Sequence, residues 1–112
     1  MTDVRLPAHL EVGAIRRLAE SQGGNAVVLS RGERDAGTIA LVMLCRGKSP
    51  ALFERMPQLD GNRSFVRTRE QDIENAGEFF LNLEKMRARD PDLWLIEVDV
   101  PDIQRFVAGL PS

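Results

Sequence analysis

The sequence contains very little of the chemistry on which many recognisable sites depend. Its 112 residues include one cysteine, one tryptophan, one histidine and no tyrosine. A single cysteine, Cys45, cannot form an internal disulfide, which favours a reducing compartment. Metal sites usually need several converging His or Cys ligands, and His9 and Cys45 are the only such residues. We therefore expect a cytoplasmic protein without a metal site or a cofactor.

Long hydrophobic runs are also missing. A membrane helix needs roughly 18 consecutive apolar residues, whereas the longest uncharged, largely apolar run spans only Ala36 to Cys45. The first seven residues, Met1 to Pro7, lack the basic segment followed by an apolar core that is typical of a signal peptide. Neither membrane association nor export is expected.

The familiar nucleotide, esterase and zinc motifs do not occur. Gly47-Lys48-Ser49 matches the end of a phosphate-binding loop, but Val42 stands where that motif needs its first glycine. A helix should also follow, and Pro50 comes next instead. The segment is therefore interpreted as a hairpin turn.

What the chain does have is the composition of one globular domain over residues 1–112. Apolar residues make up 43% and charged residues 29%, with a net charge of -2. The charge is unevenly placed: residues 31–69 carry +4 and residues 70–112 carry -6. Such asymmetry indicates either pairing of the two sections within one fold or an interaction surface.

Hydrophobic periodicity predicts the elements of the first half. Apolar residues recur at helical spacing after Pro7, which predicts a helix over residues 8–22. Strands are expected at 26–29, 38–45, 52–56 and 64–67, with 38–45 central because it is apolar on both faces. The short loops between these strands favour an antiparallel meander.

The second half begins with a capping-box pattern at Thr68 to Gln71. The helix that it would open has an apolar stripe of Ile73, Ala76, Phe80 and Leu83, widened by Phe79 and Met86. Residues 93–100 alternate as a strand, and Pro101 begins a last short helix. The fold class is thus α+β: a mixed, mainly antiparallel sheet of about five strands with three helices, in the order α-β-β-β-β-α-β-α.

Two groups of charged residues are candidates for a binding site. Glu97 and Asp99 continue a strand face that begins with apolar residues, so they need partners if that face is covered. Arg55 and Arg67 are the partners we expect, and a structural ion pair is the alternative. The loop from Arg31 to Gly37 is highly charged and includes Arg34 and Asp35; loops on rigid scaffolds often carry binding residues.

Three functions remain open. The first is a non-catalytic binding or adaptor domain that has a protein partner or self-associates, the basic section of one copy against the acidic section of another. The second is a small enzyme or ligand-binding protein that uses Arg34, Asp35, Arg55, Glu97 and Asp99. The third is nucleic-acid binding, which the scarcity of aromatic residues and the net negative charge disfavour; its basic candidates are Arg46, Lys48, Arg63, Arg67 and Arg69.

Across nearly its full length, the chain resembles an uncharacterised bacterial family, the domain of unknown function numbered 1491. Five segments carry the resemblance: residues 5–12, 34–37, 54–57, 71–75 and 90–94. The resemblance implies a bacterial cytosolic protein and brings no activity, cofactor or catalytic residue with it.

Overall fold

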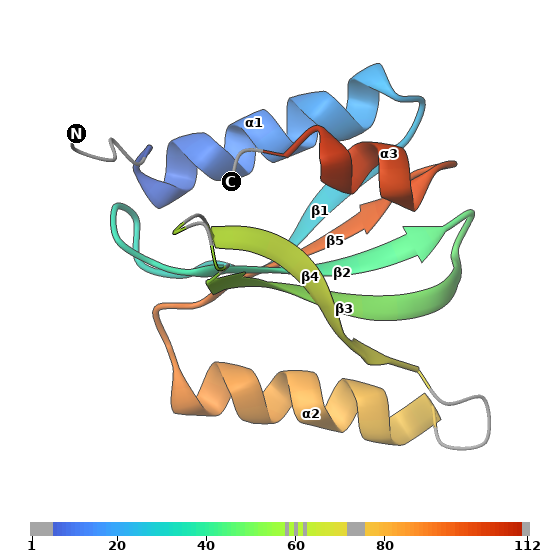
Figure 1. Ribbon diagram of the computed structural model, residues 1–112. Helices are drawn as coiled ribbons and strands as arrows, with labels where there is room; N and C mark the ends of the chain where they lie inside the picture. Colours follow the sequence, from blue (N-terminus) through green and yellow to red (C-terminus); the bar gives the residue numbers. More distant parts are fainter. Residues whose placement is uncertain (1–5, 58, 60, 62, 72–75, 111–112) are drawn as a thin grey trace.

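The computed structural model describes residues 6–57, 59, 61, 63–71 and 76–110. The elements follow the predicted order, and Figure 1 shows them as a sheet between two helical layers. They are α1 (Ala8–Ser21), β1 (Asn25–Ser30), β2 (Ile39–Cys45), β3 (Lys48–Pro57), β4 (Arg63–Glu70), α2 (Ala76–Arg89), β5 (Trp94–Asp99) and α3 (Ile103–Ala108). None of these described helices is long and apolar enough to cross a membrane.

The sheet is mixed, with the strand order β1-β5-β2-β3-β4. Strands β2, β3 and β4 form the predicted antiparallel meander, and β2 lies in the middle of the sheet. The meander does not extend to β1, however. Strand β5 lies between β1 and β2, antiparallel to the former and parallel to the latter. The prediction that β1 and β2 are neighbours was wrong because a strand from the far end of the chain occupies the position between them.

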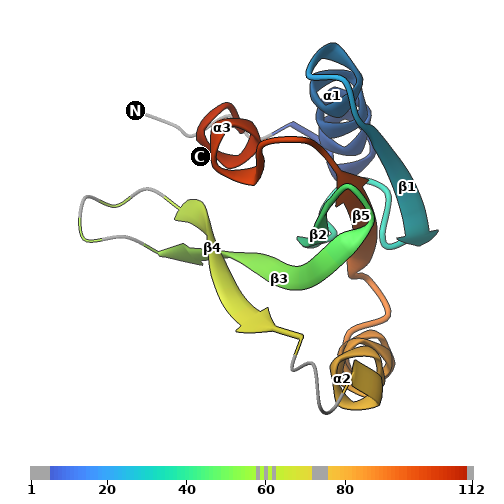
Figure 2. The ribbon, with the colours of Figure 1, turned by 90° about the vertical axis from the view of Figure 1, so that its right-hand side faces the viewer.

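The larger core lies between the sheet and the helices α1 and α3, which both cover one face (Figure 2). Strand β5 contributes the predicted alternating set of Trp94, Ile96 and Val98, continued by Val100 after its end. Helix α1 contributes its stripe, which includes Val12 and Ile15. Because alternate side chains of a strand face opposite sides, the remaining β5 residues point to the α2 side.

Helix α2 covers the other face over a smaller core. Phe79 and Leu83 are buried there against strand residues such as Leu95, and Met86 packs beside them. Phe80 was predicted to lie on the buried stripe, but it is 48% exposed. The stripe passes through Phe79 instead, since residues 79, 83 and 86 recur at the three- and four-residue spacing of one helix face. Ile73 lies outside the described residues.

The predicted capping box at Thr68 to Gln71 was also wrong. Thr68 lies within β4, its hydroxyl donating to Glu54 at 2.6 Å, and Glu70 is the last residue of that strand. The Gln71 amide donates to the carbonyl of Pro50. By contrast, the hairpin at Gly47 is confirmed: Arg46 and Gly47 take positive φ values of 53° and 76°, and Lys48 begins β3.

Candidate functional site

The charged loop from Arg31 to Gly37 is anchored by its backbone to the start of α1. The amides of Ala8 and His9 donate to the carbonyls of Asp35 and Arg34, both at 2.9 Å. The first amides of a helix have no partner within the helix, and Pro7 supplies no side-chain cap. The loop carbonyls supply what a capping side chain otherwise would, so this loop has a structural role.

Glu33 organises the loop from within. Its carboxylate accepts hydrogen bonds from the amides of Asp35, at 2.9 Å, and Ala36. Its carbonyl accepts the indole N–H of Trp94 at 2.7 Å, and its amide donates to Asp92 at 2.9 Å. The backbone hydrogen bonds from Ala36 and Asp35 hold the pKa of the Glu33 carboxyl below its usual value of 4.5.

This shifted pKa predicts a pH dependence of the stability. A carboxyl whose pKa is lowered by folding contributes stability that is complete above its unfolded pKa and is lost as the pH falls through its folded pKa. We therefore expect Glu33→Gln to lower the free energy of unfolding at pH 7, with a smaller difference from the unmodified protein below about pH 4. Urea unfolding of both proteins between pH 7 and pH 3 measures this; a difference that grows on acidification would contradict it.

Arg55 forms an ion pair with Glu11 across the larger core. The two side chains face each other from β3 and α1 and are joined by two hydrogen bonds, the Nη1–Oε2 bond being 3.0 Å long. Both are largely buried, and the Arg55 guanidinium lies 4.6 Å from the ring centroid of Phe65. The geometry therefore makes Arg55 an internal link between helix and sheet.

Glu97 and Asp99 lie on the other face of the sheet. They follow Leu93 and Leu95 on the α2 side, as the alternation of β5 predicts, and both are half-buried. The expectation that Arg55 and Arg67 pair with them was wrong. Arg55 pairs with Glu11; Arg67 pairs with Glu70 at 2.5 Å and lies over the ring of Phe53.

The five candidate residues are therefore not brought together. Arg34, Asp35 and Arg55 all surround the first turn of α1. Glu97 and Asp99 lie on the opposite face of the sheet, toward the end of β5. Strand β2 separates β5 from β3, which positions Arg55 away from both carboxylates.

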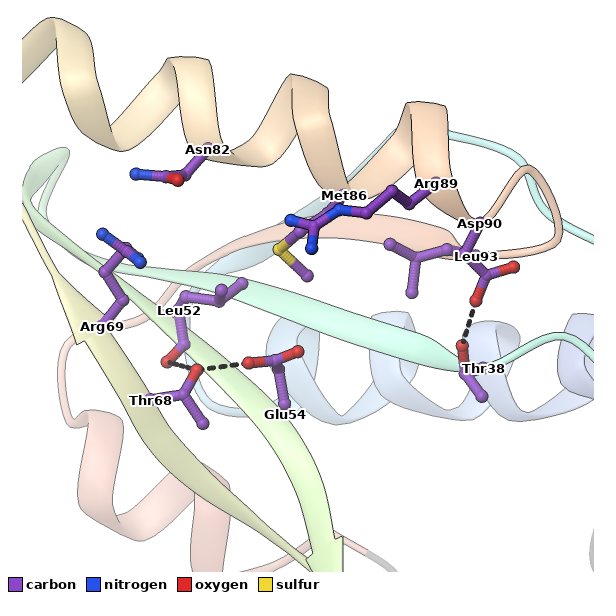
Figure 3. Close-up of a pocket in the computed structure, with 10 residues that line it drawn as sticks. All are labelled: Thr38, Leu52, Glu54, Thr68, Arg69, Asn82, Met86, Arg89, Asp90 and Leu93. Carbon is purple, nitrogen blue, oxygen red and sulfur yellow. Dashed lines mark hydrogen bonds between the residues drawn. The ribbon is translucent and has the colours of Figure 1, made fainter.

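A groove that the sequence did not reveal lies between α2 and the sheet (Figure 3). It is open to solvent and has a volume of about 440 Å³. Its floor and helical wall contain the apolar side chains of Leu52, Met86 and Leu93. Seven polar or charged residues complete the lining: Thr38, Glu54, Thr68, Arg69, Asn82, Arg89 and Asp90.

The two arginines of the groove come from different elements. Arg69 lies near the end of β4 and Arg89 is the last residue of α2. Figure 3 shows both guanidinium groups pointing into the space between the helix and the sheet. From the sequence, Arg69 was a candidate only for nucleic-acid binding, because nothing local to Arg69 or Arg89 indicates the other residue.

The two acidic side chains of the groove are held by threonine hydroxyls. Thr68 donates to Glu54 at 2.6 Å, and Thr38 donates to Asp90 at 3.4 Å. Each of these hydrogen bonds orients a carboxylate along the groove wall. The lining therefore combines two cations and two anchored anions with an apolar floor, and it is more polar than most sites for small organic molecules.

The remaining candidates of the sequence have local roles. His9 Nδ1 lies 3.1 Å from the carbonyl oxygen of Arg34, and the Cys45 thiol donates to the carbonyl of Pro101 at 3.6 Å. Within the described part of the chain, no three His, Cys, Asp or Glu residues are grouped in a way that could hold a metal ion.

Comparison with known proteins shows that the chain is similar to members of a bacterial family. A family model described as a protein of unknown function, DUF1491, matches residues 6–108. A crystal structure of a DUF1491 protein from Caulobacter crescentus CB15 is 26% identical, with a TM-score of 0.76 over 96% of this chain and 98% of that one.

Two structures determined in solution are also similar. An NMR structure of a DUF1491 protein from Caulobacter crescentus CB15 has 25% identity and a TM-score of 0.73, covering 97% of each chain. Protein Atu0922 from A. tumefaciens is 24% identical with the same TM-score, over 97% of this chain and 98% of that one, and supports the fold alone. No curated protein matches the chain.

Proposed function

The chain belongs to the DUF1491 family, whose function is unknown, and on that premise we propose that it is a non-catalytic binding domain. Its site is the groove between α2 and the sheet, and its ligand is a small organic carboxylate with an apolar body. The observation that carries this proposal is the presence of Arg69 and Arg89 above an apolar floor.

The ligand class follows from the chemistry of the lining. A guanidinium is planar and matches a carboxylate with two parallel hydrogen bonds. Leu52, Met86 and Leu93 offer apolar surface to a hydrocarbon part of the same molecule. The anchored carboxylates of Glu54 and Asp90 disfavour a ligand with several negative charges, because like charges repel at short range.

Binding is favoured over catalysis by the placement of the charged groups. An enzyme built on Arg34, Asp35, Arg55, Glu97 and Asp99 would need them in one cleft. Three of them surround the start of α1, and two lie across the sheet. Binding in the groove requires no such convergence.

A small-molecule partner is favoured over nucleic acid. The basic residues of β4 divide between the two faces of the sheet, since Arg67 lies over Phe53 whereas Arg69 lines the groove. They therefore do not form one continuous phosphate-binding surface. The single cysteine and the bacterial family support a cytoplasmic location for this binding domain.

Hexanoate is a suitable probe of the groove. We expect it to bind saturably in a calorimetric titration, and we expect Arg69→Gln to weaken binding about tenfold or more, since a hydrogen bond to a charged group is worth about 1.5–3 kcal/mol. Arg63→Gln is the matched control, an exposed arginine on the same strand outside the groove lining, and should leave the affinity within about twofold.

The proposal fails if hexanoate does not bind, or if the control weakens binding as much as the groove variant. Hexanol and inorganic phosphate separate the two contributions to affinity. Hexanol lacks the charge and phosphate lacks the apolar body, so both should bind more weakly than hexanoate.

A further inference from the structure

Strand β1 is one of the two edges of the sheet. An edge strand presents backbone N–H and C=O groups that can pair with another strand, and most proteins protect it with charged side chains or proline. The six residues of β1, Asn25-Ala26-Val27-Val28-Leu29-Ser30, include no charge and no proline. The edge is therefore chemically open to strand addition.

The opposite edge is different. Strand β4 has exposed arginines at positions 63, 67 and 69 and ends on exposed Glu70. Two copies of this strand side by side would bring like charges together, which destabilises strand pairing. The contrast singles out β1 as the edge suited to a partner.

An apolar strip adjoins the β1 edge on the α2 side. Val27 points there, as does Glu97, its partner in β5, and Val27 is 50% exposed; Leu29, 43% exposed, follows at the bulge. Glu84 and Arg87 of α2 line a shared hollow with Ser30. Phe80, 48% exposed, lies one turn before Glu84 on the same side of the helix.

Phe80 lies at about the same level along α2 as Val27 does along β1, because α2 and β1 run in the same direction. Both β1 and α2 run opposite to β5, the former by its pairing and the latter through the tight turn at residues 90–93. Moving back along β1 from Ser30 to Val27 therefore corresponds to moving back along α2 from Arg87 toward Phe80. In Figure 2, β1 forms the right-hand edge of the sheet and extends further to the right than α2.

We infer that this edge is a self-association surface, on which β1 of a second copy of this chain pairs antiparallel with β1 across a two-fold axis. An axis at Val27, within the regular part of the edge, places Val27 of each copy beside Val27 of the other. The apolar strips of the two copies then join on the α2 side. Burial of this shared strip adds to the backbone hydrogen bonds that the two edges exchange.

A second copy is the occupant because β1 is complementary to itself. An uncharged strand meets its own copy without repulsion, and a two-fold arrangement closes after two subunits. Pairing β1 with β4 of another copy would instead be head-to-tail, and it would extend into an open chain of subunits. The register shift between Val28 and Ser30 makes Leu29 a bulge and limits the regular edge to Asn25–Val28.

The interface is therefore small, and the dimer should dissociate in the micromolar range. Sedimentation velocity over a concentration series measures this equilibrium. Because the contacts are apolar and backbone-mediated, the dimer should persist in about 0.5 M NaCl. A dimer joined by the basic section of one copy and the acidic section of the other would dissociate at that salt concentration.

Val27→Lys should raise the dissociation constant at least tenfold, because a charge on the strand edge opposes pairing. Leu10→Lys is the matched control: Leu10 is 49% exposed on α1, and the same change there should leave the dimer intact. Leu29→Lys is a second test at another exposed position, and circular dichroism confirms that each variant is folded. A monomer at all concentrations, a salt-sensitive dimer, or folded Val27→Lys and Leu29→Lys variants that still dimerise like the unmodified protein would each overturn the inference.

Discussion

Replacing Glu11 by alanine should lower the free energy of unfolding by about 3–5 kcal/mol, the range observed when one partner of a buried ion pair is removed. Glu11 is only 8% exposed, and its carboxylate holds the guanidinium of Arg55 with two hydrogen bonds. In the Glu11→Ala protein, the Arg55 guanidinium stays in the interior but loses this carboxylate, which destabilises the folded state. Urea unfolding followed by circular dichroism measures the loss.

The matched control is Glu20→Ala, which removes an exposed carboxylate from the last turns of the same helix. It should change the stability by less than about 0.5 kcal/mol. The double variant Glu11→Met with Arg55→Leu should be more stable than Glu11→Ala, because both charges leave the interior together. Equal losses for Glu11→Ala and Glu20→Ala would contradict the assigned role of the pair.

Gly32→Ala should destabilise the protein by roughly 3 kcal/mol or more, since backbone must move to accept the new methyl group. A Cβ atom at Gly32 would lie 2.1 Å from the carbonyl oxygen of Asp92 and 2.6 Å from the carbonyl carbon of Leu93. Neither atom belongs to a flexible side chain. The loop would therefore separate from the turn before β5, and Glu33 would lose its contacts to Asp92 and Trp94.

Gly77→Ala is the control for this substitution. A Cβ atom at Gly77, which is in α2, would point into open space beside the helix. Because alanine is the better helix former, the change should be neutral or stabilise the protein by up to about 1 kcal/mol. Thermal unfolding of both variants measures the difference in stability. A Gly32→Ala protein as stable as the Gly77→Ala protein would show that the loop does not depend on the close approach of Gly32 to the backbone of Asp92 and Leu93.

The elements of the fold could largely be predicted from local patterns. The stripe containing Val12 and Ile15 identified α1, and the alternation from Trp94 to Val100 identified β5 and the face it buries. These patterns reflect the fixed periods of helix and strand, which each segment expresses without reference to the rest of the chain. Two local signals failed: Phe80 is exposed although it was predicted on the buried stripe of α2, and the capping box at Thr68 to Gln71 does not form because Thr68 is held by the neighbouring strand.

The candidate site could not be predicted in the same way. Arg69 and Arg89 belong to different elements, and they share a groove only because α2 packs across the face of the sheet near β3 and β4. Arg55 was recognised as a candidate, but its partner Glu11 was not, since 44 residues separate them. Their pairing depends on how α1 is placed over the sheet.

The sequence by itself determined the kinds of elements, their order, the central position of β2 and the two faces of β5. Each of these follows from the side chains of a short segment and the geometry of its own backbone. Only the tertiary structure decided that β5 enters between β1 and β2, that Glu11 holds Arg55 and that a groove opens beside α2. These features depend on which distant segments become neighbours. Periodicity can be read from one segment, whereas the energy of packing depends on the two segments that are in contact.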